Sequence, residues 1–376
     1  MPKAFKYRLY PTTQQMGQFD QILQLCRFLY NCMLKHRIWC FKAGKSVGKF
    51  DQLNELPQIK AEFPEYKAVF SQVLQDVGIR LDKAYQNFFR RVKAGDTPGF
   101  PRFKGKNWYD SFTYTQSGFS FVEGKLRLSK IGDIKIKLHR PIEGKIKTCT
   151  ITRKNGKHYV SFSCEVPATV LPPTDHCVGI DVGVADFVIT SDGEFFPKQA
   201  AYRKAEKHLK YLQRQVSRRK KGSGRRRKAV RLLAKQHEKV ANQRKDIAHK
   251  VSARLIQEND LIAHEDLRVA NMVKNHCLAK SISDAGWSIL FQFLRYKAES
   301  AGRVVVAVPP AYTSQICSDC GALVPKKLSE RWHNCPHCGL SIQRDVNAAI
   351  NILAIATKQQ GQGLCLRGYE QVAVCR

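Results

Sequence analysis

The stretch Val178-Gly-Ile-Asp-Val-Gly183 places one carboxylate in the middle of an otherwise apolar run. A short apolar run bounded by turn residues predicts a buried strand, here over residues 178–185. An unpaired carboxylate in such a strand costs several kcal/mol. Carboxylates occupy such positions when they hold metal ions, so Asp181 is a candidate metal ligand.

Two further acids repeat this pattern far along the chain. Glu265 ends the apolar stretch Leu261-Ile-Ala-His-Glu-Asp266, and Asp345 lies at the start of the helix-like run Arg344-Asp-Val-Asn-Ala-Ala349. Carboxylates from distant segments can hold two Mg²⁺ ions roughly 3.5–4 Å apart, one activating water and one stabilising the leaving oxygen. The three acids therefore predict a metal-dependent nuclease with Asp181, Glu265 and Asp345 as catalytic residues and magnesium ligands.

Four cysteines between these acids have zinc-ribbon spacing. They form the pairs Cys317-x-x-Cys320 and Cys335-x-x-Cys338, and a glycine directly follows each pair. Zinc prefers four thiolate or imidazole ligands in a tetrahedron, and a closed four-thiolate site leaves no open position for chemistry. We therefore expect one structural Zn²⁺ on the four cysteines. His333 and His337 are expected to face solvent rather than to serve as ligands.

The chain is strongly basic. It has 64 Lys and Arg against 31 Asp and Glu, a formal charge of +33. Such self-repulsion destabilises a folded protein unless a polyanion neutralises it, and nucleic acid is favoured over a membrane surface. The chain opens without an apolar leader, and no run approaches the roughly 18 apolar residues of a membrane span. These features predict a cytoplasmic, nucleoid-associated protein.

Much of this charge lies in one segment. Residues 201–250 contain 19 Lys or Arg and 3 Asp or Glu. Within them, residues 218–228 predict a basic loop between two long helices. In so basic a chain, phosphate binding is favoured over a merely solvated surface. The candidate nucleic-acid-binding residues are Arg218, Arg219, Lys220, Lys221, Arg225, Arg226, Arg227 and Lys228.

The first half of the chain changes its periodicity twice. Residues 5–10 alternate like a strand, and Thr12-x-x-Gln15 has the pattern of a capping box. Apolar residues then recur at helical spacing over residues 14–42 and 66–93. Short strands follow, ending in a hairpin around Asn155-Gly156, the favoured type I′ pair. Several antiparallel strands at this spacing predict a small barrel.

Aromatic residues accompany basic ones where this barrel begins. Two interpretations stay open at this stage, because these rings can stack on bases or fill the barrel core. They are Phe100, Phe103, Trp108, Tyr109, Phe112 and Tyr114.

Pro172-Pro173-Thr174 marks the start of a second region. Strands come first, over residues 178–185 and 187–190. Candidate strands at 261–265 and 304–308 then alternate with helices, one of them over residues 287–301. This order of elements is expected of an RNase H-like α/β fold.

Motifs spread along the chain resemble the TnpB proteins of bacterial insertion sequences, relatives of the type V CRISPR effectors. The resemblance runs from residue 1 to about 356. Its motifs are Arg8-Leu-Tyr-Pro-Thr12, Cys26-Arg-Phe-Leu-Tyr-Asn31, Pro98-Gly-Phe-Pro-Arg-Phe-Lys104, Gly179-Ile-Asp-Val-Gly183, His264-Glu-Asp-Leu267, Thr313-Ser-Gln-Ile-Cys317 and Arg344-Asp-Val-Asn-Ala-Ala-Ile-Asn351.

The resemblance implies a chain of α/β and β parts. A small wedge barrel takes its first strand from residues 1–12 and the remainder from 107–172, with a helical recognition domain inserted at 13–106. An RNase H-like (RuvC) nuclease domain follows at 173–310. Its final helix at 342–356 comes after an inserted zinc ribbon at 311–341. Residues 357–376 are expected to form a mobile tail.

The resemblance also implies a function. The protein would be an RNA-guided DNA endonuclease that binds a transposon-derived guide RNA and double-stranded target DNA beside a short flanking motif. Asp181, Glu265 and Asp345 fall on the family's catalytic acids, and the four cysteines fall on its zinc ligands. Residues 281–286, Ser-Ile-Ser-Asp-Ala-Gly, match a segment that covers the nuclease site as a lid in relatives.

Two other functions are compatible with the same residues. A transposase or resolvase-type nuclease would use the three acids without a guide. A repressor would bind nucleic acid without cutting it, although the complete set of acids argues against that.

Overall fold

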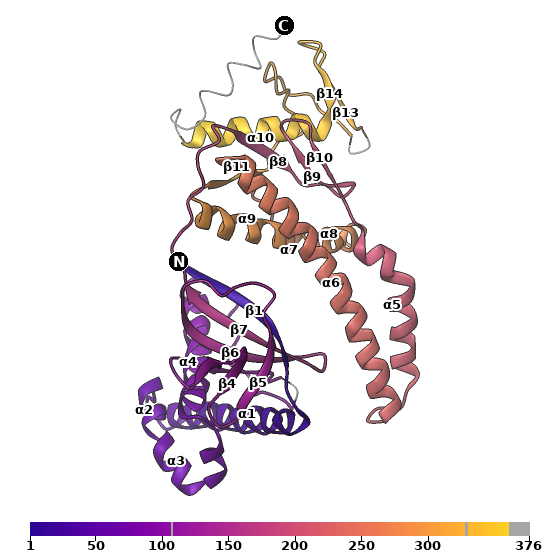
Figure 1. Ribbon diagram of the computed structural model, residues 1–376. Helices are drawn as coiled ribbons and strands as arrows, with labels where there is room; N and C mark the ends of the chain where they lie inside the picture. The colour runs from indigo at the N-terminus through magenta and orange to yellow at the C-terminus, as the bar shows by residue number, and fades with distance from the viewer. Residues whose placement is uncertain (107, 328–329, 361–376) are drawn as a thin grey trace. The chain divides into compact units, whose positions relative to one another are not determined.

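The computed structural model describes residues 1–106, 108–327 and 330–360 (Figure 1). It divides into two compact units, a first over Met1–Pro167 and a second that begins at Ala168. No helix in the described part of the chain is long and apolar enough to cross a membrane.

A seven-stranded antiparallel sheet forms the centre of the first unit. Its spatial order is β2-β6-β7-β1-β5-β4-β3. The predicted hairpin is confirmed, because Asn155 and Gly156 take φ angles of 50° and 72° between β6 and β7, as a type I′ turn requires. The strands are β1 (Pro2–Tyr10), β2 (Ser111–Tyr114), β3 (Phe119–Val122), β4 (Lys125–Leu128), β5 (Gly132–Lys137), β6 (Lys145–Lys154) and β7 (Lys157–Glu165).

This sheet is strongly curled. In a flat sheet β3 would lie about 19 Å from β7, four strands away at the usual strand spacing. The rings of Phe121 on β3 and Phe162 on β7 are instead 5.4 Å apart. The Tyr114 hydroxyl on edge strand β2 also donates to the Ser129 carbonyl just after β4, at 3.0 Å. Side chains therefore join the two ends of the sheet around a shared core.

Helices of the first unit lie between β1 and β2 in the chain. The capping box is confirmed, since Gln15 N–H donates to Thr12 Oγ1 and Thr12 N–H to Gln15 Oε1. The helix predicted from residue 66 begins only at Ser71, because Pro64 opens a 3₁₀ turn and Phe70 is extended. The helices are α1 (Thr13–Lys42), α2 (Lys49–Asn54), α3 (Leu56–Glu62), η1 (Pro64–Ala68) and α4 (Ser71–Lys93).

The six aromatic residues near the barrel divide between the two open interpretations. Tyr109, Phe112 and Tyr114 are buried in the core. Phe100, Phe103 and Trp108 are exposed, Trp108 by 80% of its surface. Only the second group is available to stack on bases.

A five-stranded mixed sheet with spatial order β10-β9-β8-β11-β12 forms the centre of the second unit. The first three strands in sequence pair antiparallel, whereas β8, β11 and β12 run parallel. The strand predicted over 178–185 stops at Asp181, because the chain bends there towards β9. The strands are β8 (Cys177–Asp181), β9 (Asp186–Thr190), β10 (Phe195–Pro197), β11 (Leu261–Glu265) and β12 (Val304–Val308).

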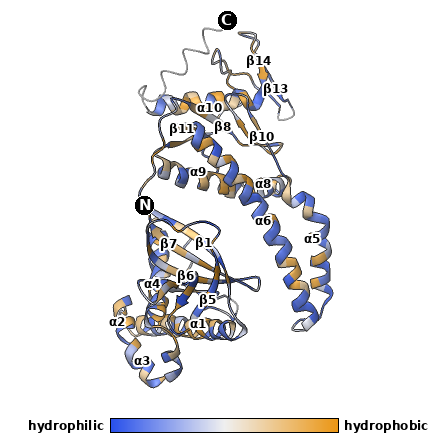
Figure 2. Ribbon diagram, viewed as in Figure 1, coloured by the Kyte–Doolittle hydropathy of each residue, from blue (hydrophilic) through white to orange (hydrophobic). Residues whose placement is uncertain are grey.

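Helices cover both faces of this sheet, which explains its apolar strands. Ile262 of β11 packs in a cluster with α6 and α9, while its neighbours Leu261 and Ala263 pack with α10. Figure 1 shows α10 crossing the sheet, and Figure 2 shows hydrophilic residues along much of α5 and α6. The remaining elements are α5 (Ala201–Arg218), α6 (Gly224–Glu258), α7 (Val269–Met272), α8 (Ala279–Ala285), α9 (Trp287–Ala301), β13 (Trp332–Asn334), β14 (Ser341–Gln343) and α10 (Arg344–Gln360).

Candidate active site

Two of the predicted acids come together because their strands are neighbours. Strands β8 and β11 pair in parallel, with Ile180 opposite His264. The next residue of each strand is a carboxylate, Asp181 on β8 and Glu265 on β11. Parallel strands present their carboxyl ends at the same edge of a sheet, where ligands bind in α/β folds. The sheet therefore places both acids at one edge.

Helix α10 brings the third acid to this edge. It passes so close to β8 that a Cβ atom on Gly179 would lie 2.0 Å from the Ala349 carbonyl oxygen. Asp345 lies one turn before Ala349, in the first turn of the helix. Gln343 Oε1 accepts from the N–H groups of Asp345 and Val346 at 2.9 Å each, which caps the helix at this point.

The three acids line one cavity of about 350 Å³. Burial, together with the neighbouring Glu265 and Asp345 carboxylates, raises the pKa of Asp181 to about 7. Burial also raises the pKa of Glu265. Hard divalent cations prefer such oxygen clusters, and their charge would restore ionisation of all three groups. The donor set therefore fits magnesium.

Side chains that were given no individual role from the sequence hold these acids in place. Thr313 Oγ1 donates to Glu265 Oε1 at 2.5 Å, and Arg344 Nε donates to Asp345 Oδ1 at 3.0 Å. Asn351 Nδ2 donates to the Thr313 carbonyl at 2.8 Å, which links α10 to the Glu265 contact. Thr313, Arg344 and Asn351 all lie in the quoted motifs, but their contacts depend on the fold.

The four cysteines form a cluster that fits one zinc ion. Their sulfur atoms all lie within 4.8 Å of one another. Cys317 and Cys338 are 3.6 Å apart at Sγ, as are Cys320 and Cys335. A tetrahedral zinc site with ordinary Zn–S bonds separates its sulfurs by about 3.8 Å. Gly321 and Gly339 take positive φ angles of 75° and 78°, as the knuckle turns require.

One prediction about this region is wrong. His333 does not face solvent but is fully buried on β13, where its Nδ1 contacts Lys326 Nζ. The pattern of β13 alternates, with exposed Trp332 and Asn334 on either side of the buried histidine. His337 is exposed, as predicted.

The basic segment also differs from its prediction. The connection between α5 and α6 is only residues 219–223, because Ser223 caps α6 by accepting from Arg226 N–H. Arg225, Arg226, Arg227 and Lys228 therefore lie on the first turns of α6 rather than in a loop. All eight predicted contact residues except half-buried Arg226 are exposed, and none forms an ion pair within the described parts of the chain.

Residues 281–286 are the predicted lid. They contribute to α8 and the glycine after it, and none of them lines the cavity of the three acids. Asp284 is buried, accepts from the N–H groups of Tyr202 and Arg203, and pairs with Arg244 of α6 at 3.1 Å. In this structure the segment is anchored to α5 and α6.

Family comparisons match most of the chain in three parts. A family described as "Probable transposase" (OrfB_IS605) matches residues 161–276, a Cas12f1-like TNB domain matches 287–352, and a helix-turn-helix domain of OrfB_IS605 matches 1–46. Within residues 1–46 the structure has strand β1 and one continuous helix, α1.

The fold is also found among solved structures. A Cas12f1 chain in a complex with single-guide RNA and target DNA superposes with a TM-score of 0.61 at 13% sequence identity. The match covers 94% of this chain and 98% of that one.

Individual relatives match over nearly the whole length. A protein of Streptomyces pristinaespiralis, named as a proposed RNA-guided DNA endonuclease, is 36% identical over 96% of this chain and 92% of its own. InsQ of Escherichia coli, named in the same way, is 34% identical over 94% and 92%. A TnpB-like protein of Acanthamoeba polyphaga mimivirus is 28% identical over 94% and 73%. The chain therefore belongs to the TnpB family.

Proposed function

We propose that the protein is an RNA-guided DNA endonuclease. It binds a transposon-derived guide RNA, recognises a short DNA motif beside the target and hydrolyses phosphodiester bonds of the target DNA. The observation that carries this proposal is the convergence of Asp181, Glu265 and Asp345 in one cavity. The relatives named as RNA-guided DNA endonucleases support the use of a guide RNA. The formal charge of +33 supports the binding of RNA.

Asp181, Glu265 and Asp345 would hold the catalytic metal, in our proposal two Mg²⁺ ions. When bound, the ions would supply an activated water and stabilise the leaving oxygen. Lys327 also lines the cavity and forms no ion pair within the described residues, so its ammonium group is available to a substrate phosphate. Arg344 keeps Asp345 oriented towards the cavity through its bonds to Oδ1.

We also propose a domain identity for each of the two units. The curled sheet of the first unit would be the wedge barrel, with α1 to α4 as the inserted recognition domain. The mixed sheet of the second unit would be the RNase H-like (RuvC) nuclease domain. The order β10-β9-β8-β11-β12, with antiparallel strands before parallel ones, supports this assignment.

The zinc ribbon would have a structural role at the nuclease site. Asn347 Nδ2 donates to the Ile316 carbonyl at 2.8 Å, and Asn347 Oδ1 accepts from Ser318 N–H at 2.9 Å. These bonds fasten the first cysteine knuckle to α10, the helix that carries Asp345.

We expect Cys335→Ala to abolish zinc binding and to unfold this region locally. Metal analysis of the purified variant, beside exposed Cys277→Ala as control, measures the stoichiometry. An unchanged zinc content in Cys335→Ala would contradict the assignment.

A cleavage assay tests the proposed function. The chain is co-expressed with the flanking region of its own locus, and the RNA that copurifies is sequenced. The particle is then given Mg²⁺ and plasmids that carry a guide-matched target beside randomised flanking bases. We expect guide-dependent double-strand breaks that Asp181→Ala abolishes while RNA and target binding persist.

The other outcomes identify the alternative functions. Cutting without a guide would indicate a transposase-like nuclease. This alternative agrees with the family description "Probable transposase". Specific binding of RNA and target without cutting would indicate a repressor.

A further inference from the structure

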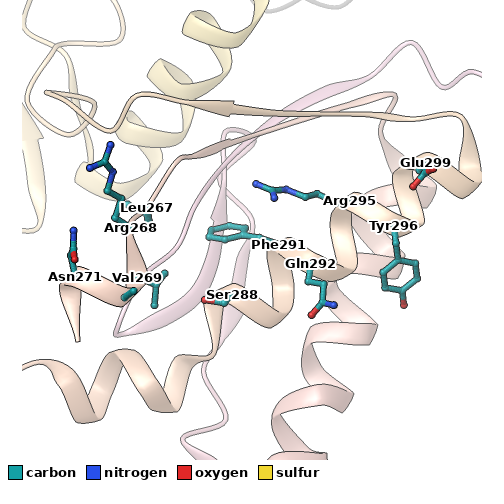
Figure 3. A pocket seen from close by; sticks show the side chains of 11 residues that line it. Leu267, Arg268, Val269, Asn271, Ser288, Phe291, Gln292, Arg295, Tyr296 and Glu299 are labelled. Carbon is teal, nitrogen blue, oxygen red and sulfur yellow. The ribbon is translucent and has the colours of Figure 1, made fainter. Parts of the chain in front are cut away.

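A second cleft, of about 710 Å³, lies beside the candidate active site (Figure 3). The turn at Leu267 and Arg268, the short helix α7 and one face of α9 form its walls. Leu267 also lines the cavity of the three acids. The two cavities are therefore neighbours with a common wall, two residues beyond Glu265.

The floor of the cleft belongs to the same packed structure as the acids. Phe291 of α9 is 8% exposed, and its ring stacks on His264 with centroids 4.2 Å apart. His264 directly precedes Glu265 on β11. A strand of nucleic acid in the cleft would thus be held at a fixed position relative to the metal-binding acids.

The walls carry groups that bind nucleotides. Arg268 and Arg295 are exposed and form no ion pair with any residue the structure describes. In the view of Figure 3 the Phe291 ring lies between these two arginines. The ring of Tyr296 is 44% exposed. Glu299 is the acidic residue of the lining, and it lies beyond Tyr296, away from Arg268 (Figure 3).

Together, the groups that line the cleft indicate one class of ligand. A guanidinium group binds phosphate oxygens in pairs, and an exposed aromatic face stacks on a base. Stacking of that kind needs a base that is not already stacked in a duplex. Asn271 and Gln292 add exposed amides, which can bond to base edges. The ligand class that satisfies all of these groups is a single nucleic-acid strand.

We infer that the cleft binds the DNA strand being cut, on one side of the scissile phosphate. This inference rests on the proposed function. Arg268 lies three residues after Glu265, so the Cα atoms of the two residues are at most about 10 Å apart. The phosphates of one strand are spaced by about 3.4 Å along the axis of a DNA duplex, and they lie further apart in an extended single strand. Arg268 therefore contacts a phosphate within about three nucleotides of the cut, and Arg268 and Arg295 are positioning residues.

Neutral phosphates test this inference directly. The guide-loaded R268Q/R295Q variant and the wild type cut guide-matched DNA under single-turnover conditions. Single phosphates around the cut are replaced by uncharged methylphosphonates. In the wild type, replacements within about three nucleotides on one side slow cleavage roughly tenfold or more, since charged hydrogen bonds contribute on that order. The variant is slow on ordinary DNA and is not slowed further at these positions.

The matched control is K274A/K358A, which removes two exposed cations outside the cleft. Its cleavage and its response to methylphosphonates should equal those of the wild type. Opening of the target duplex, followed with a fluorescent base analogue, should be the same in all three proteins.

Three results would overturn the inference. If R268Q/R295Q cuts as fast as K274A/K358A, or if the methylphosphonate effects persist in the variant, the cleft does not hold the strand and the proposed function stands. If the wild-type complex does not cut guide-matched DNA, the proposed function fails and the assignment of the cleft fails with it.

Discussion

At the scale of single residues, the ionised Asp181 carboxylate lowers the stability of the folded protein, and its proposed role as a metal ligand explains its position. Its carboxylate lies beside Glu265 and Asp345, and its pKa is raised to about 7. A group whose pKa is higher in the folded than in the unfolded protein opposes folding once it ionises. Without metal, the stability of the protein should therefore fall as the pH rises from about 4 to 7.

Asp181→Asn should remove this loss of folding stability, because an amide does not ionise. We expect the metal-free variant to melt a few degrees above the wild type at pH 8, with a smaller difference at pH 5. Magnesium should stabilise the wild type more than the variant, because it binds the folded acids. Thermal melting in EDTA and in Mg²⁺ measures both effects. Exposed Asp266→Asn is the control, and equal melting of wild type and Asp181→Asn at pH 8 would contradict the assignment.

Gly179 is a second residue whose role depends on one contact. A Cβ atom there would meet the Ala349 carbonyl oxygen at 2.0 Å, so α10 must shift if any side chain is added. We expect Gly179→Ala to destabilise the second unit by about 1–3 kcal/mol, as overpacking does, and to displace Asp345. Cleavage should fall far more than RNA binding.

Gly224→Ala is the matched control, because a Cβ at that position meets nothing within 4 Å. Cleavage assays and denaturant unfolding of both variants test the prediction. Normal cleavage by Gly179→Ala would show that α10 does not fix Asp345 through this contact.

At the scale of elements, the ion pair of Asp284 and Arg244 joins α8 to the α5–α6 hairpin. The Asp284 side chain is fully buried and also receives the N–H groups of Tyr202 and Arg203 at the start of α5. Removing it would leave Arg244 without its partner, a loss of about 3–5 kcal/mol for a buried pair. We expect Asp284→Ala to loosen α5 and α8 together, which hydrogen exchange would detect.

The exposed pair of Asp246 and Lys250 on α6 supplies the comparison. Asp246→Ala should change stability by less than about 0.5 kcal/mol, as surface pairs do. If hydrogen exchange in Asp284→Ala became faster in α8 alone, Asp284 would not hold α5 and α8 together.

At the scale of the whole molecule, the formal charge of +33 favours binding to nucleic acid. On the α5–α6 hairpin, Arg225 and Arg227 are exposed, form no ion pair within the described residues and can bind phosphates. Each phosphate contact changes the slope of log affinity against log salt by about 0.7–0.9. R225A/R227A should therefore lower the slope for guide RNA by up to about 1.4–1.8.

Titrations at several salt concentrations measure this slope, with K274A/K358A as control. An unchanged slope in R225A/R227A would exclude the hairpin from the RNA interface.

The sequence by itself determined the elements whose signal is local. The capping box at Thr12, the hairpin at Asn155-Gly156, helix 287–301 and strands 261–265 and 304–308 all appear as predicted. Each depends on neighbours in the chain or on a regular period of apolar residues. The sequence also singled out Asp181 and Glu265, because a carboxylate in an apolar strand is anomalous, and Asp345 at the start of a helix. Their catalytic role stays a prediction.

Only the tertiary structure decided which residues from distant parts of the sequence are in contact. His333 is buried through a pairing of β13 with β14, and the support of Glu265 by Thr313 spans 48 residues of sequence. The cleft of Arg268 and Arg295 exists because α9 lies beside the end of β11. Contacts of this kind arise from packing between distant segments, and no local pattern in the chain encodes them.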